Sequence, residues 1–397
     1  MSRTPKSSKH IYEKIGRELD DPDDSIQLAG PDGSPIHFTR LQKMSAVLEL
    51  MCKGLTAAEV SAAMKQRYGQ AGFIKREDPY EFFSYAARHG WIVFKPPPHL
   101  GYEGFLRRLF PWLHAEVVNT TVSGDVAARA ARTLLGIVQG ITKTRGPKST
   151  VHIGLAGGIT MRKFANRFAD LLCRAPQNMP EVIRFHPLVS GFDPYDPTTD
   201  PNSFVSYYWN QPAMQVKPEF RGFRAPAIVT PAMFEQLKDQ PGVRDAFAEK
   251  PLLDVIVTSG SDCPEHGAAR LWREYGHDGT LSQSAEVGDI LWRPIDRHGP
   301  IANHAEYRAM TLMELSDLPD FVARGKHVLL MVGPCGGCHR PKQRLLRIVV
   351  AQERPIITHL VADSRSTGAF VRQYKEEHAA LVGAKVGRPS VRPANVT

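Results

Sequence analysis

Short apolar runs alternate with stretches of helical periodicity between residues 151 and 381, and this alternation constrains the fold more than any other feature. The runs contain few polar residues, as do strands that are covered on both faces of a sheet. The intervening stretches are long enough for crossover helices between parallel strands. The expected strands are residues 151–154, 182–189, 226–229, 252–258, 328–332 and 356–361. The pattern predicts a doubly wound, mostly parallel α/β domain over residues 99–382.

The composition agrees with an ordinary folded chain. Of 397 residues, 42% are hydrophobic and 23% are charged, which excludes disorder as the main state and suggests two or three domains. The five cysteines have no disulfide-framework spacing. We find no signal peptide at the start and no apolar run long enough to span a bilayer. We therefore expect a cytoplasmic protein without a membrane partner.

A separate small module is expected over residues 38–96. Apolar residues at helical spacing between residues 41 and 51 end at Gly54, and Thr56 with Glu59 forms a capping box that begins a second helix. Asp78 followed by Pro79 begins a third helix. Residues 91–94 indicate a strand before a run of prolines. Residues 1–37, rich in Pro, Gly and Asp, are predicted to be a flexible tail.

Two glycine-rich turns each join a predicted strand to a predicted helix. The first runs through Gly157 and Gly158 to Thr160, and the second runs through Gly337 to Lys342. Glycines let a ligand approach the backbone, and free amides at a helix start favour an anion. The first turn is neither a dinucleotide fingerprint nor a phosphate-binding P-loop. The pair predicts a ligand site at the carboxyl edge of the sheet, and the alternative is a pair of tight turns without a ligand.

A third polar strand end, residues 258–262, could add hydroxyl groups to the same rim. Cys335 and Cys338 flank the second glycine turn and leave three interpretations open: a redox pair, half of a zinc site with Cys263 and His266, or small side chains that fill buried space. We find neither a nucleophile elbow nor a metalloprotease motif. No catalytic residue, no resident metal and no cofactor is predicted.

Taken together, these features resemble the SorC-type family of bacterial sugar-binding transcriptional regulators over most of the chain. The family has characteristic segments in both its helix-turn-helix module and its effector domain. The similar segments here are 54–60 (Gly-Leu-Thr-Ala-Ala-Glu-Val), 87–93 (Ala-Arg-His-Gly-Trp-Ile-Val), 154–160, 187–191 (Pro-Leu-Val-Ser-Gly), 225–227 (Ala-Pro-Ala), 287–290 (Val-Gly-Asp-Ile), 336–342 and 360–363 (Leu-Val-Ala-Asp).

The resemblance implies a winged helix-turn-helix module followed by a Rossmann-like effector domain related to sugar-phosphate isomerases. It implies a transcriptional regulator that binds double-stranded DNA, forms homo-oligomers and responds to a sugar or sugar phosphate. By the same resemblance, Gly158, Thr160 and Lys342 would hold a phosphate, while Asp289 and Asp363 would face sugar hydroxyls. Gly157 and Gly337 would complete the effector site. An isomerase-like enzyme of the same fold is the alternative.

The expected DNA contacts come from Lys75, Arg76, Tyr80, Ser84 and Arg88, in and just before the third helix. This helix departs from the family because it also carries carboxylates, which repel a phosphate backbone. The loop before it, residues 67–77, is longer than a typical turn between such helices.

Positive charge is concentrated at the two ends of the chain. Residues 40–110 contain eleven Lys and Arg against six acids, out of a net charge of +9 for the whole chain. The predicted basic tail, residues 383–397, contains a Gly-Arg-Pro triplet typical of a minor-groove hook, and a solvated flexible end is the alternative.

Overall fold

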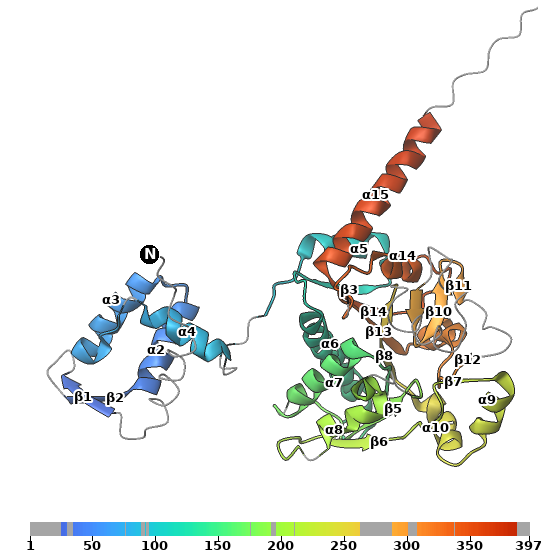
Figure 1. The fold of residues 1–397 in the computed structure, drawn as a ribbon, viewed down its shortest axis with the longest axis horizontal. Coiled ribbons are helices and arrows are strands. Elements are labelled where there is room, and N and C mark those ends of the chain that lie inside the picture. Colours follow the sequence, from blue (N-terminus) through green and yellow to red (C-terminus); the bar gives the residue numbers. More distant parts are fainter. Residues whose placement is uncertain are drawn as a thin grey trace, which may run out of the picture. The chain divides into compact units, whose positions relative to one another are not determined.

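In the computed structural model, residues 25–29, 35–75, 77–88, 92, 95–174, 176–191, 196–209, 211–262, 288–300, 308–336 and 338–386 are described. The chain divides into two compact units, Met1–Lys95 and Pro96–Thr397 (Figure 1). The division falls where the run of three prolines begins, and prolines favour an extended linker over a packed element.

Within its described residues, the first unit combines a β-hairpin with three α-helices. Its elements are β1 (Ser25–Ala29), β2 (Pro35–Thr39), α2 (Arg40–Cys52), α3 (Ala57–Tyr68), the 3₁₀ helix η1 (Gly69–Gly72) and α4 (Asp78–Arg88). The capping box predicted at the second helix is present, with the Thr56 hydroxyl accepting from the Glu59 amide and the Glu59 carboxylate accepting from the Thr56 amide. The three helices enclose a small core around Val47, Met64 and Phe82.

The hairpin places residues 25–29 and 35–37 of the predicted flexible tail (residues 1–37) in strands, while residues 1–24 and 30–34 lie outside the described residues. Strands β1 and β2 pair antiparallel, with Ile26 opposite Phe38 and Leu28 opposite Ile36. Residues 30–34 (Gly-Pro-Asp-Gly-Ser) are typical of turns, and they led to the whole segment being predicted as irregular although apolar residues alternate with polar ones on either side. The strand predicted at residues 91–94 lies outside the described residues except for Ile92, which is not in a strand.

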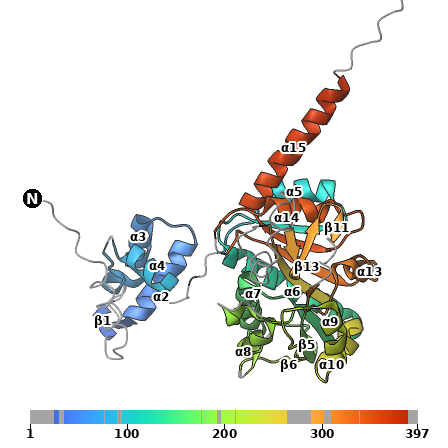
Figure 2. The same cartoon turned by 45° about the vertical axis from the view of Figure 1, so that its right-hand side comes forward.

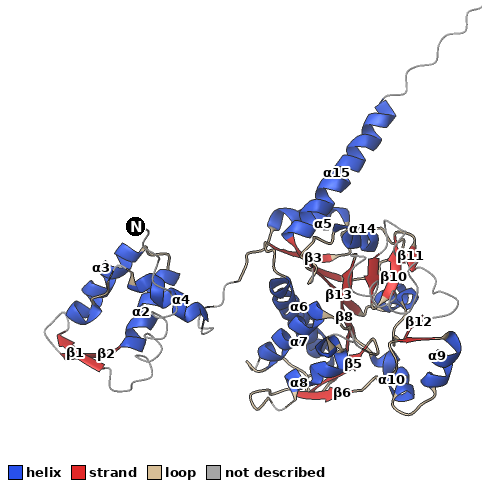
Figure 3. Ribbon diagram, viewed as in Figure 1, coloured by secondary structure: helices blue, strands red, loops and turns tan. Residues whose placement is uncertain are grey.

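The second unit is built on a ten-stranded sheet, and its helices cover both faces. Seven strands lie side by side, all parallel, in the order β6 (Lys217–Phe220), β5 (Val182–Pro187), β4 (Thr150–Leu155), β8 (Val255–Ser261), β13 (His327–Val332), β14 (His359–Asp363) and β3 (His114–Val118). Figure 3 shows the strands in red among the blue helices of this unit. Beyond its pairing with β4, strand β8 pairs antiparallel with β9 (Gly288–Ile290), which leads to β10 (Arg293–Asp296) and β11 (Gly299–Pro300).

Helices α6 (Ser123–Arg145) and α7 (Ile159–Leu172) pack together beside the strands that they connect. The chain moves across the sheet in the opposite direction from β13 to β14, so a right-handed crossover places α14 (Gln343–Val350) on the other face. Helices α5 (Leu100–Leu109) and α15 (Ser364–Val386) pack on that side with α14 (Figure 2). This arrangement confirms the predicted doubly wound, mostly parallel α/β fold.

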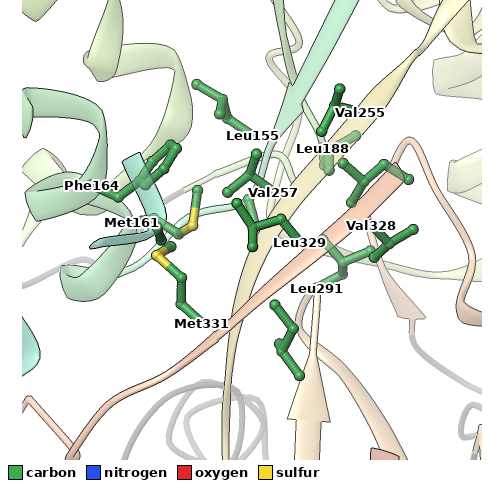
Figure 4. Packing of buried hydrophobic residues seen from close by; sticks show 14 of the residues in the cluster. Leu155, Met161, Phe164, Leu188, Val255, Val257, Leu291, Val328, Leu329 and Met331 are labelled. Carbon is green, nitrogen blue, oxygen red and sulfur yellow. The ribbon is translucent and has the colours of Figure 1, made fainter. Parts of the chain in front are cut away.

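The core lies between the sheet and these helices. Figure 4 shows Met161 and Phe164 of α7 gathered with Leu155, Val257 and Met331 of three strands, all of them almost completely buried. Burial of one such side chain stabilises the fold by about 1.5–3 kcal/mol. The apolar runs in the sequence therefore correspond to the buried strands at the core of the second unit.

Shorter elements connect the main ones. They are η2 (Pro197–Thr199), η3 (Pro201–Phe204), α8 (Val205–Tyr208), α9 (Pro231–Lys238), α10 (Val243–Glu249), η4 (Lys250–Leu252), η5 (Leu315–Asp317) and α13 (Leu318–Ala323). The strand expected at residues 226–229 is only β7 (Ile228–Val229). It pairs antiparallel with β12 (Arg308–Ala309) in a separate two-stranded sheet, so its predicted place among the parallel strands was wrong. Within the described residues, no helix is both long and apolar enough to cross a membrane.

At the C-terminal end, α15 continues to Val386, so the predicted tail from residue 383 begins inside a helix. Residues 387–397, including the Gly-Arg-Pro triplet, lie outside the described residues.

Candidate functional site

Four neighbouring strands, β4, β8, β13 and β14, end at the same edge of the sheet. Each leads into a polar or glycine-rich segment: residues 156–158, 260–262, 333–336 and 363–366, respectively. In open parallel sheets this carboxyl edge is where ligands bind. The segments that we selected from the sequence therefore meet at one place.

The loop after β4 brings Gly157 and Gly158 to the start of α7. A Cβ added at Gly157 would lie only 3.0 Å from the Thr199 carbonyl oxygen, so a glycine is needed there. Gly158 has φ +110° and donates its amide to the same carbonyl at 2.9 Å. No side chain caps α7, so amides of its first turn remain available to an anion. Thr160 lies in that turn and is buried.

The turn after β13 packs against this loop. A Cβ added at Gly336 would lie 3.4 Å from the side chain of Ile159, so the two glycine-rich turns are in contact. The turn closes on itself, because the Cys335 amide donates to the Arg340 carbonyl and the His339 amide donates back to the Cys335 carbonyl, both at 3.0 Å. Gly337 lies outside the described residues.

Lys342 is buried at the start of α14. Its Nζ donates to the Gly260 carbonyl oxygen at 2.6 Å, and its amide donates to Ser366 Oγ at 2.9 Å. The ammonium group therefore joins the end of β8 to the start of α14. Its predicted contact with a phosphate stays a prediction.

Asp262, which follows β8, places a carboxylate at the N-terminus of α14. Its Oδ2 accepts from the Leu345 amide at 3.2 Å. Burial raises the pKa of Asp262, while the helix amides and the nearby ammonium of Lys342 partly oppose that rise. An anion-binding position at α14 is thus filled by a side chain of the protein itself.

Asp363 ends β14 and is fully buried. Its Oδ1 accepts from the Ser366 amide at 2.7 Å, whereas Oδ2 has no hydrogen-bond partner in the described structure. Burial raises the pKa of Asp363. An unpartnered buried carboxylate oxygen is costly unless a donor satisfies it, and a ligand hydroxyl can supply that donor.

Asp289 lies in β9 and is partly buried, opposite Ser261 in the strand register. Of the residues predicted to bind the effector, Lys342 and Asp363 are joined through Ser366. Asp289 reaches the same edge beside the segment containing Gly260 and Asp262. Ammonium, carboxylate and hydroxyl groups together suit a ligand rich in hydroxyl groups.

The sequence did not reveal the roles of two residues at this edge. Asp262 was selected only as part of a polar strand end, and Ser366 was not selected. The signal for Ser366 was the Asp-x-x-Ser pattern from residue 363 at a strand-to-helix boundary, where the aspartate accepts from an amide three residues later.

A buried histidine pair lies elsewhere in the unit, on β4 and β5. His152 Nδ1 and His186 Nε2 are 3.0 Å apart, and with Glu249 they form a group compact enough to hold a metal ion. The Glu249 carboxylate, however, already accepts from Arg221 and faces Arg184 at 3.5 Å. Two guanidinium groups around the acid oppose a cation there.

Helix α4 of the first unit carries the predicted DNA contacts. Tyr80 is 61% exposed and Ser84 is partly buried, while Phe82 packs into the core on the opposite side of the helix. Lys75 is exposed, and its amide donates to Asp78 Oδ2 at 2.8 Å, which fixes the start of the helix. Arg88 is the last residue of α4, and Arg76 lies outside the described residues.

Cys335 is a buried free thiol, and Cys338 is partly buried. Cys263 and His266, the other half of the possible zinc site, lie outside the described residues. Among the described residues, neither thiol belongs to a group that could hold a metal ion.

A helical first unit followed by a doubly wound α/β unit is the architecture of the SorC-type regulators, and the expected fold class is confirmed. The full-length sorbitol operon regulator SorC from Klebsiella pneumoniae has a similar structure, with a TM-score of 0.52 and 13% sequence identity, over 83% of this chain and 98% of that chain.

A transcriptional regulator from Streptococcus pneumoniae TIGR4 is similar with a TM-score of 0.51 and 13% identity, over 70% of this chain and 97% of that chain. No family model and no curated protein matches the sequence. At such low identity these similarities establish the fold.

Proposed function

We propose that this protein is a cytoplasmic DNA-binding transcriptional regulator whose DNA affinity is controlled by a small sugar or sugar phosphate. The observation that carries the proposal is the similarity over 83% of the chain to a full-length operon regulator, a larger share than the 302 residues of the second unit make up. The concentration of positive charge in residues 40–110 supports a polyanionic partner.

In this proposal, α4 is the helix that reads DNA. Its exposed side carries Tyr80 and Phe83, which are 61% and 41% exposed, together with Ser84. Aromatic and hydroxyl side chains suit contacts with thymine methyl groups and base edges. Lys75, Arg76 and Arg88 would contact phosphates at either end of the helix. Such contacts position the protein on the duplex without reading its sequence.

The effector would bind at the carboxyl edge of the sheet. The uncapped start of α7, at Gly158 and Thr160, offers amides to an anionic group. The unpartnered oxygen of Asp363 offers an acceptor to a sugar hydroxyl. Gly157, Asp289, Gly337 and Lys342 would surround the same ligand, and a homo-oligomer would place two or more α4 helices on one operator.

The direct test is fluorescence anisotropy of the full chain with duplex DNA from upstream of its own gene, over a range of salt concentrations. We expect binding that weakens as salt rises, and weaker binding by the Lys75→Ala/Arg88→Ala variant. Lys143→Ala/Arg167→Ala, which removes the same charge from exposed positions of α6 and α7 in the second unit, is the matched control. Absence of binding at low salt refutes the proposal.

The effector is tested by thermal-shift measurements with free and phosphorylated sugars, because a ligand of the native state raises its melting temperature. A hit should change the DNA affinity, and Asp363→Asn should weaken the response.

One observation favours the second candidate, an isomerase-like enzyme. A buried carboxylate with a raised pKa and a free oxygen, as at Asp363, has the properties of a general base. Turnover of pentose or hexose phosphates that is lost in Asp363→Asn would support the enzyme. Absence of turnover, with DNA binding intact, would exclude it.

A further inference from the structure

Three neighbouring parallel strands each begin with a histidine. His114, His359 and His327 are the first residues of β3, β14 and β13, which lie side by side (Figure 3). Because the strands are parallel, the three rings lie at the amino edge of the sheet, opposite the candidate effector site. A cleft of about 930 Å³ opens there, between this edge and helices α5 and α6. We call it the amino-edge cleft, and its volume is that of a small-molecule site.

Two arginines of the cleft have no counterion in the described structure. Arg132 of α6 is partly buried and forms no ion pair among the described residues. Burial lowers the pKa of its guanidinium, the nearby charge of Arg129 lowers it further, and the charge of Glu116 opposes the shift only in part. Arg107 of α5 is exposed, and it too has neither an ion pair nor a side-chain hydrogen bond among the described residues. A partly desolvated cation without a counterion is stabilised when an anion binds beside it.

The acid in the lining does not supply that anion. Glu116 accepts from Arg129 Nε through one carboxylate oxygen and from Thr133 Oγ1, at 2.8 Å, through the other. Both oxygens are engaged, and the charge of Glu116 is balanced by Arg129. The lining therefore holds three guanidinium groups, those of Arg107, Arg129 and Arg132, against this one carboxylate, which leaves an excess of positive charge.

The three histidines line one side of the cleft, and we call them the histidine wall. The His114 and His359 rings stack with centroids 4.8 Å apart, and His327 meets His359 edge-on at 5.5 Å. Burial lowers the pKa of His359 to about 4, and His114 and His327 contribute to the shift, so the ring is neutral at pH 7. Neutral imidazoles can donate hydrogen bonds to an anion without adding charge.

The helix side of the cleft has room for a ligand. Gly136 and Gly140 lie one turn apart on α6 and are both exposed. A Cβ added at either position would meet nothing within 4 Å. The space beside Arg132 is therefore not occupied by neighbouring side chains of the described chain.

We propose that the amino-edge cleft binds a small polyanion, a metabolite carrying two or more phosphate or carboxylate groups, held by Arg107 and Arg132 against the histidine wall. A divalent cation does not fit: among the described residues, the only group with metal-ligand geometry is His152, His186 and Glu249. The cleft is distinct from the effector site, so the proposal stands or falls independently of the function proposed above.

The test is isothermal titration calorimetry of the full chain with pyrophosphate and, separately, with citrate at constant ionic strength. We expect saturable binding of at least one probe, and the comparison distinguishes a phosphate ligand from a carboxylate ligand. Arg107→Gln/Arg132→Gln should weaken binding by at least about tenfold, because each charge-assisted hydrogen bond contributes strongly. Arg107→Gln alone, at an exposed position, keeps the test valid if the double variant does not fold.

The matched control is Arg108→Gln/Arg167→Gln, which removes two exposed arginines of α5 and α7 that do not line the cleft. This variant should bind the probes as the parent does. No binding of either probe, or an equal loss in both double variants, overturns the proposal. Sedimentation provides a further check: if Arg107→Gln/Arg132→Gln changes the oligomeric state and leaves probe affinity unchanged, the cleft is a contact between copies and the proposal is wrong.

Discussion

Replacement of Asp254 by Asn should destabilise the second unit more than any single exposed ion pair can. Asp254 precedes β8, and its side chain is 2% exposed. Its carboxylate accepts from both terminal nitrogens of Arg145, at 2.8 and 2.6 Å, from Lys326 Nζ at 2.8 Å and from the His152 amide at 3.1 Å. These bonds lower the pKa of Asp254 against the opposing effect of burial. One carboxylate thus joins α6, β4 and the start of β13.

The size of the loss follows from the exposure of the partners. Removal of one member of a fully buried ion pair costs about 3–5 kcal/mol. The Arg145 and Lys326 side chains are 42% and 26% exposed, so water can partly replace the lost carboxylate. We therefore expect Asp254→Asn to lower the free energy of unfolding by about 2 kcal/mol. In a unit of this size, that loss lowers the melting temperature by about 3 °C.

Differential scanning calorimetry of the full chain measures this shift in the transition of the larger unit. The matched control is Asp320→Asn, which breaks an exposed pair with Arg354 whose side chains are 70% and 57% exposed. The control should cost less than about 0.5 kcal/mol. Equal melting temperatures for Asp254→Asn and the parent, or an equal shift in the control, would refute the reasoning.

Three further predictions concern stability. Burial lowers the pKa of His186 to about 4 in the folded chain, whereas its pKa in the unfolded chain is near 6.5. Because the unfolded chain therefore binds a proton first, the contribution of His186 should lower the free energy of unfolding by about 3 kcal/mol as the pH falls from 6.5 to 4. Urea titrations should show a smaller fall for His186→Gln. Gly191→Ala should lower the free energy of unfolding of the second unit by more than about 2 kcal/mol, because φ is +79° and the new Cβ would lie 2.5 Å from the Ala227 Cβ. The control is Gly54→Ala in the first unit, where φ is +88° but the new Cβ would meet nothing within 4 Å, and it should cost only about 1 kcal/mol. Thr56→Ala should lower the stability of the first unit by about 1 kcal/mol through loss of the helix cap, and an unchanged urea midpoint for that unit would contradict this.

The parts of the fold that sequence could predict are those governed by local rules or by continuous apolar runs. The helix starts at Thr56 and Asp78 follow from side chains that cap their own helices, and β13 is apolar almost throughout because both of its faces are covered. Strand β6 reads Lys-Pro-Glu-Phe and lies at an edge of the sheet, where it needs no apolar run. Strand β3 was missed because Glu116 interrupts it, and that side chain faces the amino-edge cleft.

The candidate site was predictable only as a set of strand ends. Parallel strands bring their carboxyl ends to one edge, so the glycine turns could be placed together before the structure was known. The hydrogen bond from Lys342 to Gly260 and the placement of Asp262 at α14 depend on how that helix crosses the end of β8, and spacing along the chain does not encode this. The amino-edge cleft was not predictable for the same reason, since its three histidines come from distant segments.

The position of β3 has a consequence for synthesis of the protein. Strand β3 is the first strand of the larger unit to leave the ribosome, and it pairs with β14, the last. Residues 119–358 must be made before this partner exists, and until then the backbone donors and acceptors of β3 that face β14 lack their native partners. Pairing of strands that are so far apart in the sequence slows folding, because folding rates fall as the sequence separation of contacting residues rises. Completion of the larger unit must therefore await translation of residues 359–363, however early its other strands assemble.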